Sequence, residues 1–557
     1  MDERIKTEAE GAREFSMRTR TANLYRMQSK KFDLAVVGGG ITGAGVALDA
    51  VSRGLSVALI EKRDFASGTS SRSSKLIHGG LRYLEQFQFR LVREALHERA
   101  TLARIAPHLA APLPFLVPVY SAARRSPLGS NRLKLRLGLW LYDMLAGRRN
   151  IARHRWIDRN EMLRLSPALD PDGLRGGFLY HDGLTDDARL VIEVIKTAAE
   201  RGAVFANYTE AQRLELNAGQ VSTIEAKDAL SGRNFDLRAE VIVNAAGVWA
   251  DDVARLSDKG AERNLRPSKG IHVVVPADKL NNCAAVLIPS LGEQRFLFVI
   301  PWQGRTVIGT TDTDYAGSLD DPTAEADEID RVVESAARCF PQANLSTADV
   351  ISAFAGLRPL VGREGASTSE LSRAEEIIES RSGLISIIGG KLTTYRRMAE
   401  RVVDIVSSRL NRNGEHSVIG PCETENIELA GGAVAKNDLK HEAERAASEF
   451  GLTAETAEHL MQSYGGNHRA ILEIIRESGE LKAPLVEGLP HIEAEVIYAA
   501  RCEMAANVED FLARRTRIAL LGREGGRSCA ARVARLMARQ LDWTDEQAQS
   551  AMAEFVL

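Results

Sequence analysis

Three glycines near the N-terminal end of the chain have the spacing of a nucleotide-binding turn, Gly38-x-Gly40-x-x-Gly43. The first glycine permits a tight turn, the second lets the backbone approach a pyrophosphate, and the third lets a helix pack closely on a strand. Glu61, at the end of the next apolar run, can accept hydrogen bonds from a ribose diol, and its charge would repel the 2′-phosphate of NADP. By itself the spacing fits both NAD and FAD, and it can also be a structural turn.

A second stretch, residues 69–84, combines hydroxyl groups with glycines in the order Thr-Ser-Ser-Arg-Ser-Ser-Lys-Leu-Ile-His-Gly-Gly-Leu-Arg-Tyr-Leu. Such a segment offers many hydrogen bonds at low steric cost, which suits a chain that runs beside an extended dinucleotide and favours FAD over NAD. A solvated serine-rich loop is the alternative, but such a loop seldom ends in His-Gly-Gly-Leu-Arg-Tyr. We interpret His78, inside this segment, as a cofactor contact rather than a base.

A third candidate is the turn Gly389-Gly-Lys-Leu-Thr-Thr394, which opens a long helical pattern. A flavin that accepts a hydride develops negative charge around N1 and the C2 carbonyl, and the unpaired N–H groups of a helix N-terminus stabilise such charge. An ordinary turn between a strand and a helix is the other interpretation.

A parallel sheet is needed to position these residues. Phe32–Val37 and Leu55–Ile60 are short apolar runs typical of buried parallel strands, and the helical pattern Ile41–Ser52 between them completes a βαβ unit. The order strand, glycine, helix recurs in two later segments: Val241–Gly247 with a helix through Leu256, and Leu384–Gly390 with a helix over about Thr393–Leu410.

The remaining patterns predict two further domains. Strand-like runs without glycine fingerprints, at Ile271–Val275, Phe296–Ile300 and Thr306–Gly309, suggest an antiparallel sheet inserted into the nucleotide-binding domain. After Pro421 the chain turns to amphipathic helical runs: Lys436–Phe450, Ala454–Ser463, His468–Ser478 and Ile492–Glu503.

We therefore predict an α/β fold with a Rossmann-like FAD-binding domain of the glutathione-reductase type, an inserted antiparallel-sheet substrate domain and an all-α C-terminal domain. The predicted bounds are 1–30 for an N-terminal arm, 31–415 for the interleaved FAD-binding and substrate-binding domains, and 416–557 for the helical domain.

Composition excludes several classes of protein. The 72 basic residues are offset by 75 acidic ones, for a net charge of −3, so nothing global predicts nucleic-acid binding. Five widely spaced cysteines argue for reduced thiols in the cytoplasm and against a disulfide framework or a metal site. The first 30 residues lack the apolar core of a secretory signal. The apolar stretch Ile105–Ala123 contains four prolines, which favours a strand and its approach loop over a membrane helix.

The combination of motifs resembles the FAD-dependent glycerol-3-phosphate dehydrogenase family of the aerobic, bacterial type. The resemblance runs from about Phe32 to the C-terminus, where Tyr498, Arg501 and residues 503–505 and 510–516 are similar to the C-terminal domain of that family. It implies hydride transfer from C2 of sn-glycerol 3-phosphate to N5 of FAD, which yields dihydroxyacetone phosphate. The motifs that carry it are Gly38–Gly45, Ser70–Leu84, Asn244–Trp249, Gly309–Asp312, Gly356–Leu360 and Gly389–Arg396.

The resemblance also implies which residues bind the substrate. Arg82, Arg358, Arg373 and Lys391 stand where the family places substrate-contacting cations, and arginine offers planar bidentate donors to a phosphate. The family commonly has a histidine shortly after the arginine matched by Arg373, and this chain has none there. For any single arginine, a surface charge is the alternative.

His272 in Lys-Gly-Ile-His-Val-Val-Val matches the family's base, and its alternation with apolar residues places it opposite Val273 on a strand. A hydrogen-bonded core histidine is the other interpretation. We predict His272, Arg358 and Arg82 as catalytic residues, and Tyr83 as a residue that orients the substrate.

The predicted contacts of FAD come from all the motifs above. They are Gly38, Gly40, Thr42, Gly43, Glu61, Thr69, Ser70, Ser74, Lys75, His78, Gly79, Gly80, Ala246, Gly247, Gly356, Gly390, Lys391, Leu392 and Thr393. Two other groups are given supporting roles: Thr310, Thr311 and Asp312 in the pocket wall, and Asp186, Asp187 and Arg189 in an ion-pair network at a helix start, with Asp186 as its N-cap.

Between Arg124 and Arg155 nine Lys or Arg residues accompany a single acid, Asp143, and surround the apolar run Leu137–Leu145. Such a segment can dock on an anionic leaflet, and a core helix flanked by solvated charge is the alternative. Because bacterial members of the resembling family are peripheral inner-membrane enzymes that reduce quinone, we expect a cytoplasmic protein attached to the inner face of the cell membrane with a membrane quinone as acceptor. A homodimer is left open.

Three rival functions remain. An oxidase of the same fold would pass electrons to O₂ and release peroxide. A flavin-fold protein could use its helical tail mainly as a binding or regulatory module. A flavin amine oxidase would share the nucleotide-binding half but would not need several cations for a phosphate.

Overall fold

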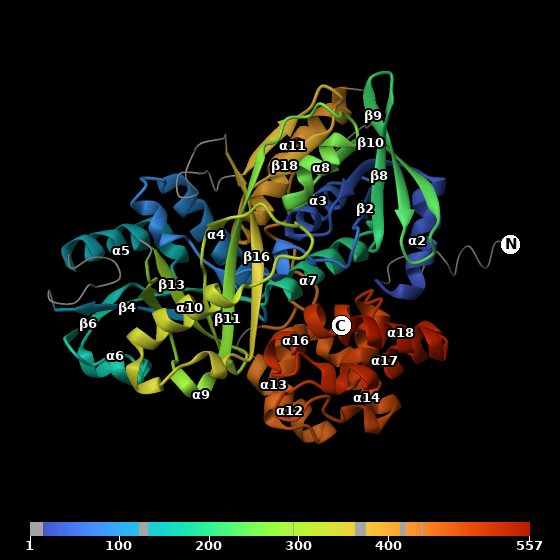
Figure 1. Ribbon diagram of the computed structural model, residues 1–557. Coiled ribbons are helices and arrows are strands. Elements are labelled where there is room, and N and C mark those ends of the chain that lie inside the picture. The colour runs from blue at the N-terminus through green and yellow to red at the C-terminus, as the bar shows by residue number, and fades with distance from the viewer. Residues whose placement is uncertain are drawn as a thin grey trace.

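The computed structural model describes residues 15–121, 132–292, 295–362, 375–412, 419–435 and 438–556. Two large β-sheets lie side by side, and a domain of C-terminal helices packs below them in the view of Figure 1. The α/β class, the inserted sheet and the helical C-terminal domain predicted from the sequence are confirmed.

The first sheet has eight strands, of which β18, β10, β1, β2 and β7 run parallel in that order. Its central strands β1 and β2 are buried on both faces, as expected for apolar parallel strands. The strands are β1 (Lys31–Val37), β2 (Val57–Ile60), β7 (Val204–Ala206), β8 (Thr209–Asn217), β9 (Gln220–Asp228), β10 (Asn234–Asn244), β17 (Glu376–Glu379) and β18 (Ile385–Ile388).

Helices cover one face of this sheet, and a helix and a hairpin cover the other. α3 (Ile41–Ser52) packs between α7 (Asp187–Glu200) and α11 (Tyr395–Arg412) over β1. The approach of α11 is close, because a Cβ atom on Gly45 of α3 would lie 2.8 Å from the Tyr395 ring. Helix α2 (Met17–Ser29) and the hairpin of β8 and β9 share an apolar cluster on the opposite face.

The second sheet has ten strands and is antiparallel except where β12 pairs with β4. The strands are β3 (Leu76–Ile77), β4 (Ala111–Tyr120), β5 (Arg155–Ile157), β6 (Leu174–Leu184), β11 (Leu265–Pro276), β12 (Ala285–Pro289), β13 (Phe296–Trp302), β14 (Arg305–Gly309), β15 (Thr313–Asp314) and β16 (Ser352–Val361). The proline-rich stretch predicted as a strand is β4. In the described parts of the chain, no helix is both long and apolar enough to cross a membrane.

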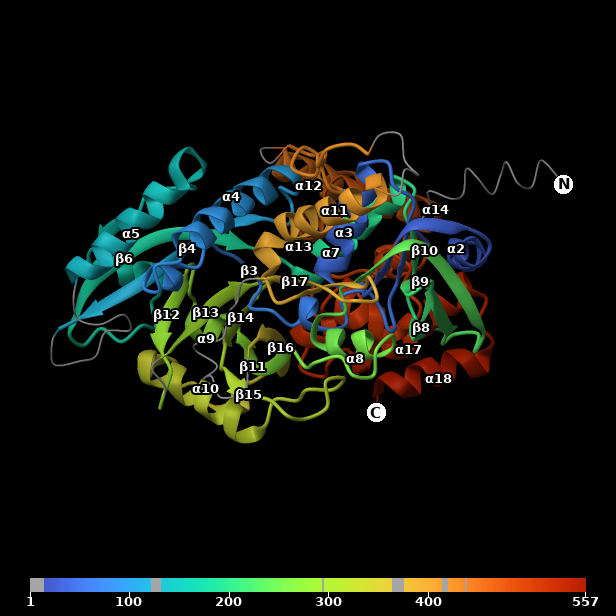
Figure 2. The same ribbon diagram turned by 90° about the horizontal axis from the view of Figure 1, so that it is seen from above.

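Six helices lie around the second sheet and at the junction of the two sheets. They are α4 (Phe89–Ile105), α5 (Arg132–Ala146), α6 (Arg159–Leu165), α8 (Ala250–Arg255), α9 (Ala277–Leu280) and α10 (Ala326–Cys339). In Figures 1 and 2, α5 lies at one end of the molecule and the β8–β9 hairpin at the other.

The C-terminal helices agree with the four amphipathic patterns, although Lys436 lies outside the described residues, and three further helices follow. Their apolar side chains join one core cluster with β4, β6, β11 and β13 of the second sheet. The helices are α12 (Leu439–Phe450), α13 (Ala454–Tyr464), α14 (His468–Glu477), α15 (Ala494–Cys502), α16 (Ile518–Leu521), α17 (Arg527–Leu541) and α18 (Asp545–Val556).

The N-terminal segment differs from the predicted arm over residues 1–30. Met17–Ser29 form α2, which begins with a capping box between Ser16 and Thr19. Its buried face consists of Arg20, Asn23 and Met27, and Arg20 donates to Asn207 O at 2.5 Å. Because two of these three residues are polar, hydrophobic patterning does not reveal the helix. Residues 1–14 lie outside the described part of the chain.

Candidate active site

The glycine turn between β1 and α3 lines a cavity of about 390 Å³ at the carboxyl ends of the parallel strands. Gly38 has a φ of +113°, and a Cβ atom on Gly43 would lie 1.9 Å from Gly38 O. Gly43 therefore serves the packing of helix on turn and does not line the cavity. Gly40 is the N-cap of α3 and has no side chain to cap it, which leaves the helix start accessible to a pyrophosphate.

Glu61 is held at the end of β2 by backbone donors. Its Oε2 accepts from Gly39 N at 2.6 Å and its Oε1 from Arg63 N at 3.0 Å. Burial raises the pKa of Glu61, and these two hydrogen bonds oppose the rise. The carboxyl group lines the cavity, where it can meet a ribose diol.

A second cavity, of about 670 Å³, continues from the first. Such a volume is in the range of pockets for ligands much larger than a three-carbon molecule. The residues that line both cavities are Thr69, Ser73, Pro359, Gly390, Lys391 and Leu392. An extended molecule bound in the first cavity would therefore reach the second one beside the turn that opens α11.

That turn has a left-handed backbone conformation at two positions, and glycine tolerates this conformation better than any other residue. Gly389 and Gly390 have φ values of +75° and +81°, and a Cβ atom on Gly390 would lie 2.3 Å from Met398 Cε. η7 (Leu392–Thr394) then leads into α11, and Thr393 Oγ1 accepts from His78 N at 3.2 Å. The two predicted cofactor segments, residues 69–84 and 389–394, thus meet in the fold.

His272 lies on β11 between two cross-strand neighbours of opposite size. Gly309 of β14 leaves room for the ring, since a Cβ atom there would lie 2.4 Å from His272 Cδ2. Phe354 of β16 stacks on the other face of the imidazole, with ring centroids 4.8 Å apart. Ser74 Oγ lies 2.8 Å from His272 Nε2, and no described residue forms a hydrogen bond with Nδ1.

His272 lines the larger cavity and is 3% exposed. Burial lowers its pKa to about 3, and the positive charges of Lys75 and Arg358 contribute to this shift. The imidazole is therefore neutral at neutral pH and has the charge state of a proton acceptor.

Arg358 on β16 lies across Gly270 of β11, where a Cβ atom would be 2.3 Å from its Nη2. Its guanidinium group donates to Thr310 Oγ1 at 2.9 Å and to Asp312 Oδ1 at 3.2 Å. Arg295 forms a second ion pair with Asp312 and also lines the cavity. Thr310 and Asp312 thus take the wall positions predicted for them.

Two further cations face the same cavity. Arg82 and Tyr83 belong to η2 (Leu81–Leu84), and Lys391 Nζ lies 3.6 Å from the centroid of the Tyr83 ring. Arg82, Arg358, Lys391 and His272 come from four separate segments, so the fold brings together charged residues that are far apart in the sequence.

Comparisons with known proteins agree with this geometry. Residues 33–396 match the family described as FAD dependent oxidoreductase, and residues 422–548 match the C-terminal domain of alpha-glycerophosphate oxidase. Glycerol-3-phosphate dehydrogenase 2 of Mycobacterium tuberculosis is 39% identical over 532 residues, which cover 95% of this chain and 88% of that protein. The chain belongs to the FAD-dependent glycerol-3-phosphate dehydrogenase family.

Two more members of this family are similar over nearly their whole length. The aerobic glycerol-3-phosphate dehydrogenase of Staphylococcus aureus is 39% identical, with 88% of this chain and 87% of that protein covered. The solved structure of the glycerol-3-phosphate dehydrogenase from Bacillus halodurans, complexed with FAD, has a TM-score of 0.79 and 34% identity over 97% of both chains. Membership of the family makes this protein an FAD-dependent oxidoreductase, and the first cavity, with its glycine turn and Glu61, fits the dinucleotide.

Most of the residues that the sequence singled out line the two cavities. Arg82, Tyr83, His272, Arg358 and Lys391 line the larger one. Arg373 lies outside the described residues. The predicted FAD contacts that line at least one cavity are Gly38, Gly40, Thr42, Glu61, Thr69, Ser70, Ser74, His78, Gly80, Ala246, Gly247, Gly356, Gly390, Lys391, Leu392 and Thr393.

Lys75 and Gly79 have places other than those predicted, and neither lines either of the two cavities. The Lys75 ammonium group is fully buried against Asp187 at 2.8 Å. Gly79 packs against α5, where its N–H donates to Tyr142 Oη at 2.9 Å. Asp186 does cap α7, as predicted, by accepting from Ala188 N at 3.1 Å.

Sequence reasoning missed Arg295, Gly270 and the bond between Ser74 and His272. Arg295 stands just before an apolar strand, and nothing local distinguishes it from a surface arginine. Gly270 precedes His272 by two residues on β11 and so lies on the same face, which is a signal that alternation could have given.

Proposed function

We propose that the protein oxidises sn-glycerol 3-phosphate to dihydroxyacetone phosphate. The observation that carries this proposal is the meeting of Arg82, Arg358, Lys391 and the neutral His272 in one cavity, continuous with the cavity that fits FAD. When bound, FAD supplies the acceptor for the hydride on C2 of the substrate. The side chains of the protein must then bind the phosphate and take up the hydroxyl proton.

The phosphate is bound by the fixed cations. Arg358 is held in place by Thr310, Asp312 and the carbonyl of Thr311, so little side-chain entropy is lost when it binds an anion. Lys391 packs over the Tyr83 ring and adds a second positive charge. Glycerol lacks the phosphate and gains nothing from these charges, so it should be a poor substrate.

His272 takes the proton of the C2 hydroxyl group. In the structure Lys75 and Arg358 help to lower the pKa of its ring, after burial. A phosphate dianion beside Arg358 offsets that positive charge and makes the imidazole more basic when substrate is bound. Substrate binding and the strength of the base are therefore coupled.

We further propose that a membrane quinone accepts the electrons. The larger cavity extends from His272 to an apolar part between η2, α4 and α5. A three-carbon phosphate ester would not fill this part. Aromatic and aliphatic side chains there suit a quinone ring. They are Leu81, Leu84, Phe87, Phe89, Leu135, Leu137 and Leu141.

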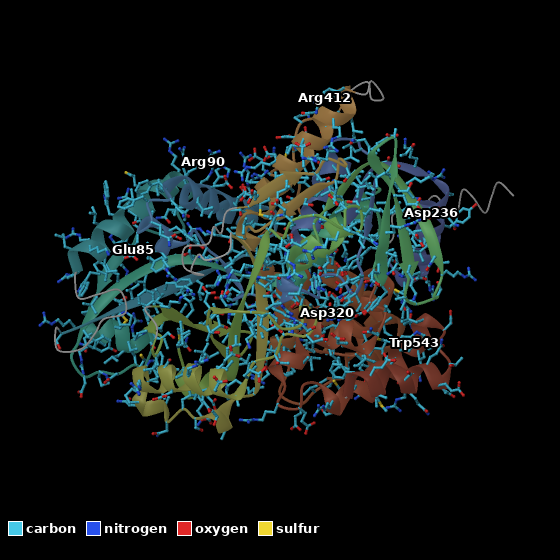
Figure 3. The ribbon with its side chains drawn as sticks, turned by 45° about the horizontal axis from the view of Figure 1, so that its top comes forward. Glu85, Arg90, Asp236, Asp320, Arg412 and Trp543 are labelled. Atoms are coloured by element: carbon cyan, nitrogen blue, oxygen red, sulfur yellow. The ribbon has the colours of Figure 1, made fainter. Side chains whose placement is uncertain are left out.

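The surface beside this apolar part supports contact with a membrane. On α5, Leu133, Leu137, Trp140 and Met144 recur at helical spacing and are 73%, 62%, 54% and 54% exposed. Phe87 nearby is 77% exposed. The opposite face of α5 is buried through Leu135, Leu139, Tyr142 and Ala146. Figure 3 shows Glu85 and Arg90 at this end of the molecule, away from Trp543 of the helical domain.

Basic residues lie within and shortly after α5 in the sequence. Within the described residues they are Arg132, Lys134, Arg136, Arg148, Arg149, Arg153 and Arg155. Asp143, the acid among them, is bonded to Asn150 and His154. Each cation near an anionic leaflet contributes about 1 kcal/mol to binding. Residues 124–131 of the predicted docking segment lie outside the described part of the chain. A cytoplasmic protein attached to the inner face of the membrane follows from the proposal.

Steady-state assays test the substrate and the acceptor together. The purified flavoprotein should reduce a soluble quinone with glycerol 3-phosphate, and glycerol at the same concentration should give no measurable rate. Rapid peroxide production in air without quinone would instead favour an oxidase. Equal rates with glycerol and glycerol 3-phosphate would contradict the proposed role of the cations.

A further inference from the structure

A buried arginine of the helical domain reaches the segment that leads into the active site. Arg517 lies between η10 (Asp510–Arg515) and α16, and its side chain is 2% exposed. Its guanidinium group donates to Ser71 O at 3.1 Å and to Asp186 Oδ1 at 3.2 Å, and it forms an ion pair with Asp187. One side chain thus joins the helical domain, the start of α7 and the cofactor segment.

Asp187 gathers donors from the cofactor segment around the same carboxylate. Ser73 donates to it through its backbone N at 2.9 Å and its Oγ at 2.7 Å, and Lys75 Nζ lies 2.8 Å away. Burial opposes ionisation of this group, but Lys75 and Arg517 lower the pKa of Asp187, so it is a carboxylate at neutral pH. Residues on both sides of Ser74 are therefore fixed by one fully buried anion.

Ser74 and Lys75 in turn contact the environment of His272. Ser74 Oγ lies 2.8 Å from His272 Nε2. Lys75 Nζ lies 5.0 Å from the centroid of the Phe354 ring, which stacks on the imidazole. The edge of the His272 ring thus meets Ser74, whose neighbours Ser73 and Lys75 are bound to Asp187, and its face meets Phe354, which Lys75 approaches.

We propose that Arg517 is a positioning residue for the oxidation step: through Asp187 it fixes the Ser73–Lys75 segment, so that Ser74 orients the His272 ring. This inference rests on the proposed role of His272 as the proton acceptor. It gives the helical domain a part in the chemistry, since Arg517 of that domain is a second cation on Asp187 beside Lys75.

Other contacts attach the same part of the helical domain without touching the cofactor segment. Ser352 Oγ donates to Leu520 O at 2.7 Å, and Arg305 Nε donates to Leu521 O at 2.9 Å. Arg514 and Arg515 both pair with Asp64. Because these contacts remain when Arg517 is replaced, loss of its side chain should leave the domain docked.

The test uses full-length flavoprotein and anaerobic stopped-flow reduction by glycerol 3-phosphate. We expect Arg517→Gln to retain FAD and to lower the limiting rate of flavin reduction at least tenfold, with less than a threefold change in the substrate concentration for half-maximal rate. Arg517→Lys should recover part of the rate. Ser352→Ala, the matched control for domain docking, should stay within about twofold of the unchanged protein.

A double-mutant cycle separates positioning from general damage. Ser74→Ala should lower the limiting rate as Arg517→Gln does, and the double variant should be no slower than the slower single variant. If Arg517→Gln is isolated without FAD, the cycle is carried out with Arg517→Lys in its place. The inference would be overturned if the rate losses of the two single variants multiplied in the double variant. It would also be overturned if the flavin of Arg517→Gln were reduced as fast as that of Ser352→Ala. Failure of the unchanged protein to be reduced by glycerol 3-phosphate would instead refute the proposed function.

Discussion

At the scale of single residues, Arg358 is the cation whose surroundings are best defined. Its guanidinium group is anchored by Thr310 and Asp312, and its side chain is 22% exposed. Replacement by alanine leaves Asp312 with Arg295 as its ion-pair partner in the wall and removes a charge that the phosphate needs. We expect Arg358→Ala to cost roughly 3–5 kcal/mol of transition-state binding, or more than about a hundredfold in kcat/KM.

The control for this variant is Arg266→Ala. Arg266 lies on the neighbouring strand β11, pairs with Asp314 at 2.6 Å and does not line either cavity. Its kcat/KM should remain within about twofold of the unchanged protein. An effect of less than tenfold for Arg358→Ala would show that this arginine does not bind the phosphate.

The roles of single residues could be predicted where the neighbouring sequence specifies them. The glycine turn, Glu61 and the strand position of His272 follow from spacing and alternation, and the structure places them around the two cavities. The contacts that hold them could not be predicted. The Ser74–His272 bond spans 198 residues and the Arg517–Asp187 pair spans 330, and nothing in either neighbourhood specifies its partner.

At the scale of elements, two glycines of one turn should respond differently to the same substitution. A Cβ atom on Gly40 would meet only Ser70 Oγ, at 3.1 Å, whereas one on Gly43 would lie 1.9 Å from Gly38 O. Gly40→Val should therefore fold as a colourless apoprotein, because the side chain blocks the pyrophosphate. Gly43→Val should lose the packing of α3 on β1 and unfold at a lower temperature.

Visible absorbance and thermal unfolding of both purified variants check this difference. If Gly40→Val retained a full complement of flavin, the glycine turn would not be the pyrophosphate site.

The exposed face of α5 makes a separate prediction about membranes. Leu133→Glu/Trp140→Glu places two charges on the apolar face without changing a residue that lines either cavity. We expect this variant to lose flotation with vesicles rich in anionic lipid, while glycerol 3-phosphate still bleaches its flavin. Leu216→Glu/Leu230→Glu is the control, since these residues are 49% and 50% exposed near the distant β8–β9 hairpin. Equal flotation of both variants would contradict docking through α5.

Elements with an apolar periodicity were predictable, and those with a polar buried face were not. The βαβ unit and the four amphipathic C-terminal runs correspond to helices and strands of the structure. Helix α2 escaped prediction because it buries Arg20 and Asn23. For α5 the sequence left a core helix and a segment that docks on a membrane open. Leu139 is buried, as a core helix requires, and Trp140 on the other face is exposed, where membrane docking stays a prediction.

At the scale of the whole molecule, buried neutral histidines should make the protein sensitive to acid. Burial, with Arg189 and Lys196, lowers the pKa of His108 to about 3, and no described residue forms a hydrogen bond with its ring nitrogens. On acidification the unfolded chain binds a proton near pH 6.5, whereas the folded protein does not bind one until about pH 3. The unfolding free energy therefore falls as pH drops through this window and is unaffected by His108 above it.

Urea unfolding at pH 7 and pH 5 measures this contribution. In His108→Gln the loss of unfolding free energy between the two pH values should be smaller by about 2 kcal/mol than in the unchanged protein. An identical loss in both proteins would mean that His108 is already protonated in the folded state.

The central claim is that one continuous cavity holds FAD beside cations that select a phosphorylated alcohol. Its most direct test is an anaerobic titration of the purified protein, followed by its visible spectrum. We predict a yellow protein whose flavin bands are bleached by glycerol 3-phosphate and are unchanged by glycerol. A polypeptide that is colourless and cannot be reconstituted with FAD, or a flavin that glycerol bleaches equally well, would contradict the account.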